Sequence, residues 1–92
     1  MRLRNNDVLD MFINRRGVAE NHTQNLYIDK RGILWNYATP IALYYNDEIY
    51  LNNRRYSSTT SKHQNYLRRN ANVIEIDEVE IRDLVFKLKY LS

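Results

Sequence analysis

The sequence predicts one α+β domain, residues 1–92, in which a four-stranded antiparallel sheet of two hairpins and a short fifth strand is covered by two or three helices. Apolar residues alternate with period two between residues 26 and 52 and recur at helical spacing on both sides of that stretch. The hydrophobic fraction of 43% is that of a globular protein, and 92 residues supply a single core. We expect the helices to pack on one face of the sheet.

The first helix is expected over residues 7–16. Asp7 is suited to cap its start, and Gly17 is suited to end it. Four apolar residues recur at helical spacing in this segment: Val8, Leu9, Phe12 and Ile13. Residues 18–24 are polar and have no period, which is typical of a loop.

Two hairpins should follow. Residues 26–28 and 33–37 flank a turn at residues 29–32, in which glycine supplies the positive φ. Thr39-Pro40 interrupts the alternation. Residues 41–52 then indicate a second hairpin, with a two-residue turn at Asn46-Asp47.

Alternation also assigns side chains to the faces of this sheet. One face of each hairpin is expected to be apolar, carrying Ile33, Trp35 and Tyr37 on the first and Ile41, Leu43 and Tyr45 on the second. Of these, Trp35, Tyr37 and Tyr45 should lie in the core. Tyr44 and Tyr50 would form an exposed aromatic face, which with Tyr56 and Tyr66 could stack on bases or contact a protein.

A second helix should begin at Ser58 or Thr59 and carry His63, Tyr66, Leu67 and Asn70 on one side. Residues 73–76 alternate like a short strand. Asp77 and Glu80 then resemble a capping pair that opens a last element over residues 78–91, with apolar residues at helical spacing: Ile81, Leu84, Val85, Leu88 and Leu91.

The last element has a competing interpretation as a strand, because Leu84, Phe86, Leu88 and Tyr90 also alternate. As a helix, it carries three apolar residues outside its main stripe, namely Val79, Phe86 and Tyr90. Such width suggests burial on two sides. A homodimer contact or deep insertion in the core would supply it.

Positive charge gathers in the middle of the chain. The net charge is +3, from 14 Lys and Arg against 11 Asp and Glu. No acid lies between Glu48 and Glu75, whereas this window holds five cations: Arg54, Arg55, Lys62, Arg68 and Arg69. A local charge of +5 from those residues is a plausible footprint for an anion.

A run of hydroxyl residues stands inside the same window, at the start of the predicted second helix. Free backbone N–H groups and the helix dipole favour a phosphate or carboxylate there, although a cap and a turn would equally explain such a run. The candidate residues for contact with an anion, nucleic acid or partner are therefore Arg54, Arg55, Tyr56, Ser57, Ser58, Thr59, Thr60, Ser61, Lys62, His63, Arg68 and Arg69.

Catalysis finds little support in the sequence. There is no cysteine and no Gly-rich phosphate loop, and no acid between positions 49 and 74 could orient His63. We expect this histidine to bond to a neighbouring strand. His22 and His63 lack carboxylate or thiolate partners at ligand spacing, so we expect the protein to bind neither a metal nor a cofactor. We also expect that the protein is not an enzyme.

Two segments carry a resemblance to a known family. Tyr37-Ala38-Thr39-Pro40-Ile41-Ala42 and, further on, Tyr56-Ser57-Ser58-Thr59-Thr60-Ser61-Lys62-His63 resemble the signature of a family of small uncharacterised phage and plasmid proteins. The likeness covers roughly residues 25–70 and implies an origin in a mobile element. It brings no reaction and no catalytic residues, but small phage proteins often bind and disable host machinery, including CRISPR and restriction nucleases.

These observations favour a small accessory protein that binds an anionic target without catalysis. The target would be a nucleic acid or a host nucleoprotein, for example a CRISPR-type defence nuclease. The alternative is a protein–protein interaction module or homodimeric regulator without nucleic-acid contact. No membrane span is expected, and the first residues lack the apolar core of a signal peptide, which predicts the cytoplasm, that of the host cell if a phage encodes the chain.

Overall fold

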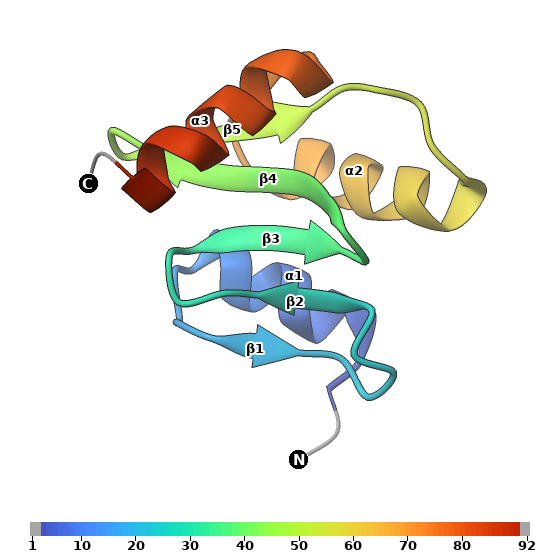
Figure 1. Ribbon diagram of the computed structural model, residues 1–92. Coiled ribbons are helices and arrows are strands. Elements are labelled where there is room, and N and C mark those ends of the chain that lie inside the picture. The colour runs from blue at the N-terminus through green and yellow to red at the C-terminus, as the bar shows by residue number, and fades with distance from the viewer. Residues whose placement is uncertain (1–2, 91–92) are drawn as a thin grey trace.

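A computed structural model describes residues 3–90. The described residues form three helices and one sheet. Figure 1 shows their arrangement, coloured from the N-terminus to the C-terminus. Within the described residues these elements are α1 (Asn5–Ile13), β1 (Ala19–Glu20), β2 (Leu26–Ile28), β3 (Ile33–Asn36), β4 (Thr39–Tyr45), β5 (Glu48–Asn52), α2 (Ser58–Asn70), β6 (Val73–Ile76) and α3 (Glu78–Tyr90). The α+β class is confirmed.

The sheet is larger than predicted and mixed. Across residues 3–90 it contains six strands in the order β1-β2-β3-β4-β5-β6, and each strand from β1 to β4 is antiparallel to the next. β6 instead runs parallel to β5, because α2 carries the chain back across the sheet. β1 lies in the predicted loop, where a two-residue strand has no period that a sequence could reveal.

Helices cover both faces of this sheet, so the expectation of one covered face is wrong. α1 and α2 lie on one face and α3 crosses the other (Figure 1). The strands carry apolar side chains on both faces. Towards α1 and α2 the core is built on Leu34, Ala42 and Leu51, and towards α3 it is built on Ile33, Leu43 and Ile81.

Ile41 and Leu43 do not share one face of the sheet as predicted, because the pairing of β3 and β4 is irregular. Leu34 pairs with Ala42 but Trp35 pairs with Pro40, so the register shifts and Ile41 is left between the pairs. Ile41 therefore packs in the α1 and α2 core, whereas Leu43 packs against α3. Contrary to the predicted break, Thr39 and Pro40 belong to β4.

The tyrosines do not form the expected exposed face. Tyr37 is 68% exposed and has a φ of 55°, so it belongs to a turn and not to the core. Tyr44 packs on Phe12, with ring centroids 5.2 Å apart, and donates its hydroxyl to the Ile13 carbonyl at 2.5 Å. Tyr50 is half-buried on the opposite face, beside α3, where Trp35 and Tyr45 also pack.

The turns and the last helix confirm other predictions. Gly32 has a φ of 83°, and Asn46 and Asp47 both have positive φ in the two-residue turn. The last element is a helix, which excludes the strand interpretation, and Asp77 caps it by accepting the Glu80 N–H at 2.8 Å. Leu91, the last apolar residue at helical spacing in the predicted element, lies outside the described residues.

The first helix differs from its predicted bounds. Arg4 is the N-cap of α1, and Asp7 stands three residues later, where its carboxylate accepts the Arg4 N–H at 3.0 Å. The helix ends at Ile13 and not at residue 16, because the left-handed conformation begins at Arg15, before Gly17. None of the described helices is long and apolar enough to cross a membrane.

Candidate anion-binding site

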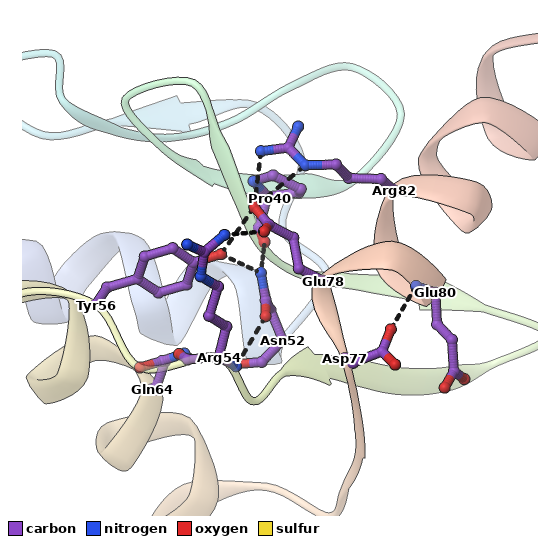
Figure 2. A network of polar contacts seen from close by, with 9 residues as sticks. All are labelled: Pro40, Asn52, Arg54, Tyr56, Gln64, Asp77, Glu78, Glu80 and Arg82. Carbon is purple, nitrogen blue, oxygen red and sulfur yellow. Dashed lines mark hydrogen bonds and ion pairs between the residues drawn. The ribbon is translucent and has the colours of Figure 1, made fainter.

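The loop from β5 to α2 is held by a fully buried asparagine at the end of β5. Asn52 Nδ2 donates to the Pro40 carbonyl at 3.0 Å and to the Tyr56 hydroxyl at 2.9 Å (Figure 2). Its Oδ1 accepts the Arg54 N–H at 3.0 Å. One side chain thus fixes both Arg54 and Tyr56 in the loop, because each of its polar atoms is used inside the protein.

A buried glutamine of α2 secures the same loop from the other side. Gln64 Nε2 donates to the Asn52 carbonyl at 2.6 Å and to the Arg54 carbonyl at 3.0 Å. Gln64 is only 2% exposed, so these carbonyls would have little access to water without it. The backbone that presents Arg54 is therefore fastened to the helix as well as to the sheet.

Glu78 of α3 accepts hydrogen bonds from three side chains at this junction. One of its oxygens forms an ion pair with Arg54, while the other accepts from the Tyr56 hydroxyl at 3.2 Å and from Arg82 at 3.1 Å (Figure 2). The hydrogen bond from Arg54 lowers the pKa of Glu78, and that from Arg82 lowers it further. Burial raises the pKa of Tyr56, whose ring lies 5.5 Å from the Arg54 guanidinium carbon.

A second carboxylate fixes Arg68 on α2. Arg68 donates to Glu75 Oε1 from Nε at 3.1 Å and from Nη2 at 2.8 Å, and its Nη1 donates to Asn65 at 2.8 Å. Two of the five cations in the acid-free window are thus paired. The inference of an unneutralised site is wrong, because Glu75 and Glu78 follow the window in sequence and fold back beside it.

A surface depression of about 470 Å³ opens between this loop and α2. It contains no carboxylate among its described lining residues, which are Asn53, Arg54, Arg55, Tyr56, Ser61, Gln64, Asn65 and Arg68. Arg55 is exposed and has no ion pair within residues 3–90, so its donors face solvent. Five of the twelve predicted residues therefore meet in one place, at a site rich in hydrogen-bond donors.

Three amides of this depression were missed: Asn53, Gln64 and Asn65. Sequence reasoning concentrated on charge, whereas an amide group donates hydrogen bonds without one. Gln64 and Asn65 stand between the two cationic parts of the window, at Lys62 and Arg68. That position on the helix is the signal that could have identified them.

The hydroxyl run does not act as one surface. Ser57, and not Ser58 or Thr59, caps α2, with its Oγ 3.4 Å from the Thr60 nitrogen. Thr60 is buried and donates to Asn36 Oδ1 at 2.7 Å. Ser58 and Thr59 are exposed at the helix start, and Ser61 lines the depression. Helix capping therefore explains Ser57, and packing against β3 explains Thr60.

The remaining predicted residues lie elsewhere. His63 is buried, and burial lowers the pKa of its ring. Within the described residues it does not form the expected hydrogen bond to a neighbouring strand. Lys62 is exposed outside the depression lining. Arg69 lies near Tyr66, where a hydrogen bond to Asp10 raises the pKa of the tyrosine and Arg69 opposes that rise.

The histidines and carboxylates of the described residues do not gather into a metal site. Among residues 3–90, the structure brings together no group of three or more histidines and carboxylates that could hold a metal ion. The polar cluster around Glu78 combines one carboxylate, which accepts, with two guanidinium groups and a phenol, which donate to it. Guanidinium groups in excess of carboxylates favour an anion over a cation.

The fold and the depression together define a small α+β protein with a donor-rich surface site at the β5–α2 junction. The chain belongs to DUF8033, a family of unknown function, whose model matches residues 7–83. No curated protein and no solved structure matches the chain. The family match includes the segment that carries the phage and plasmid resemblance, while the mobile-element origin stays a prediction.

Proposed function

We propose that this protein binds an anionic partner through the β5–α2 depression and performs no catalysis. In this proposal it is an accessory protein of a phage or other mobile element and acts in the host cytoplasm. Its target is a nucleic acid or a host nucleoprotein, of which a CRISPR-type defence nuclease is one example. The observation that carries the proposal is the depression itself, which gathers three arginines and three amides without a carboxylate in its lining.

The roles of the three arginines differ. Ion pairs with Glu78 and Glu75 hold Arg54 and Arg68 in fixed orientations, which lowers the entropy lost on binding but offsets part of their charge. Arg55 has no such partner within the described chain and lines the same depression. We therefore assign the largest electrostatic contribution to Arg55, with a guanidinium fork suited to a phosphate.

The direct test is fluorescence anisotropy with labelled single-stranded RNA, single-stranded DNA and duplex DNA at low salt. Binding should weaken steeply as salt is added, because phosphate contacts release counterions. Arg55→Glu should reduce affinity by about tenfold or more and lower the salt dependence by about one contact. The matched control is Arg31→Glu, which makes the same charge change in the β2–β3 turn, at the opposite end of the sheet.

A pull-down from host lysate identifies the kind of target. If nuclease treatment abolishes capture and no host protein was captured, the target is a free nucleic acid. If the treatment releases a host protein that was captured before it, the target is a nucleoprotein. A partner that survives treatment and still binds Arg55→Glu supports the alternative, an interaction module without nucleic-acid contact. Absence of binding in both experiments, with folded protein, overturns the proposal.

A further inference from the structure

A second cavity, of about 510 Å³, lies at the end of the sheet opposite the β5–α2 depression. Two hairpin turns border it, the β2–β3 turn at residues 29–32 and the β4–β5 turn at Asn46-Asp47, together with residues 15–18 after α1. Figure 1 shows both turns at the end of the sheet away from the β5–α2 loop. Strand order explains the space, because β3 and β4 are joined at the other end of the sheet.

Much of the lining of this cavity is apolar. Phe12 and Ile28 belong to the buried core, and Met11 and Leu88 are half-buried at its edge. Val18 also lines the cavity although it is 67% exposed. An apolar ligand group seated here would remove these side chains from water, and both the volume and the apolar lining are those of small-molecule sites.

One wall of the cavity is held in place by contacts within the chain. Tyr44 packs on Phe12, and the Arg15 guanidinium carbon lies 4.3 Å from the centre of the Tyr44 ring. Arg15 also pairs with Asp47 at 3.0 Å, which ties the segment after α1 to the β4–β5 turn. The wall is therefore formed before a ligand arrives, so little ordering entropy is lost on binding.

The two carboxylates of the lining already have partners in the chain. Asp29 Oδ1 accepts the N–H groups of Arg31 at 2.9 Å and Ile33 at 3.0 Å. Asp29 Oδ2 accepts the indole N–H of Trp35 at 2.9 Å, which fixes the β2–β3 turn. Asp47 is engaged by the ion pair described above. Neither carboxylate therefore requires a cationic ligand.

Two cations of the same lining have no carboxylate partner. The side chains of Lys30 and Arg31 are exposed and form no ion pair within residues 3–90. With Arg15 they make three cations against the two carboxylates, so the lining has an excess charge of +1. One excess positive charge beside an apolar surface is complementary to a ligand with one negative charge and an apolar body.

We propose that this cavity binds a small amphipathic carboxylate. The apolar body lies between the two hairpin turns, against Met11, Val18 and Leu88, and the carboxylate faces Lys30 and Arg31. This inference goes beyond the proposed anion binding and does not depend on it, because the two cavities share no lining residue.

A titration of the full chain followed by ¹H–¹⁵N NMR tests the proposal. The probes are 1-naphthoate and octanoate, which carry one carboxylate on an aromatic and on an aliphatic body. Saturable shifts should be confined to the amides of residues 15–18, 28–32 and 44–47, with a Kd of about 1 mM or lower for 1-naphthoate. 1-Naphthalenemethanol and 1-naphthylmethylammonium carry the same aromatic body and should bind at least about threefold more weakly.

Two surface variants test the charged and the apolar parts of the site. Lys30→Glu should weaken 1-naphthoate binding at least about threefold, because it places a negative charge beside the carboxylate. Its matched control is Lys62→Glu, the same charge change at an exposed position of α2 outside this lining. Val18→Asp should also weaken binding at least about threefold, since it replaces an apolar contact with a charge.

The control for Val18→Asp is Val79→Asp on the outer side of α3. Val79 is 79% exposed, as Phe86 and Tyr90 are also exposed, so the predicted deep insertion of these three residues in the core is wrong. Val79 lies outside the cavity lining, and its replacement should leave 1-naphthoate binding unchanged. The NMR spectrum of each variant shows whether it is folded.

Three results would overturn the proposal. The first is the absence of saturable binding of both carboxylates at millimolar concentration, or shifts centred on other residues. The second is equal affinity for the carboxylate, the alcohol and the ammonium probe, since charge would then play no part. The third is binding that Lys30→Glu and Val18→Asp weaken no more than their controls do.

Discussion

α2 and α3 are helices of 13 residues each on opposite faces of one sheet, yet they use their side chains in opposite ways. α2 buries Thr60, His63 and Gln64 beside its single buried apolar residue, Leu67. α3 buries Ile81 and Val85 but leaves Val79, Phe86 and Tyr90 exposed. Apolar composition therefore does not determine burial here. α2 is positioned by specific hydrogen bonds, whereas α3 leaves apolar side chains exposed.

The largest expected effect contrasts the apolar residues of the two helices. Leu67→Ala should lower the free energy of unfolding by about 2–5 kcal/mol, because it empties a fully enclosed site on the α2 face. Phe86→Ala removes a larger side chain but should change stability by no more than about 0.5 kcal/mol, because Phe86 is exposed. Urea denaturation measures both, and equal losses would contradict the contrast drawn between the helices.

The next effect concerns the polar fastening of α2. Gln64→Ala leaves the carbonyls of Asn52 and Arg54 without their donor, and because the bond to Asn52 is buried we expect a loss of about 1–3 kcal/mol. Asn65→Ala is the neighbouring control, since Asn65 is exposed and should contribute within about 0.5 kcal/mol. If the two variants prove equally stable in urea, Gln64 does not secure the loop as inferred.

The smallest effect is a pH dependence that originates at His63. Burial lowers the pKa of this residue in the folded chain, whereas the unfolded value is about 6.5. Between the two values the unfolded chain binds a proton that the native chain does not, so stability falls as pH decreases from about 6.5 towards the lowered pKa. Above about pH 6.5 the His63 ring is neutral in both the folded and the unfolded chain, so it causes no loss of stability there.

Urea denaturation at about pH 7.5 and about pH 5.5 measures this loss. His63→Gln should show a smaller difference between the two conditions, because the carboxylates that titrate at lower pH are common to both proteins. An unchanged difference in the variant would assign the pH dependence to other groups. It would also show that the histidine ring takes up its proton as readily in the folded chain as in the unfolded one.

Much of the fold was predictable because it depends on local patterns. The alternation around Gly32 and around Asn46-Asp47 identified both hairpins, and the Asp77 cap identified the start of α3. The two-sided core, the register shift beside Ile41 and the parallel β6 were not predicted. Each of these depends on which segments meet in space, and a period of two gives no information about that.

The candidate site was predicted in part for a similar reason. Arg54, Arg55 and Arg68 were identified because cations gathered without a nearby acid in sequence. The partners that neutralise Arg54 and Arg68 are Glu78 and Glu75, which follow that window directly and reach the arginines through the folding of α3 and β6. Charge counted along a chain therefore overestimates charge in space wherever the following elements fold back.

The order of strands in the sheet equals their order in the chain, and this has a consequence for how the protein is made. Each strand from β2 to β5 pairs with the one synthesised immediately before it, so the sheet can assemble from its first edge while translation continues. Only β6 must wait, until the whole of α2 has emerged. We therefore expect the side chains of the donor-rich depression to be fixed only after β6 and the start of α3 have formed, since Glu75 pairs with Arg68 and Glu78 pairs with Arg54.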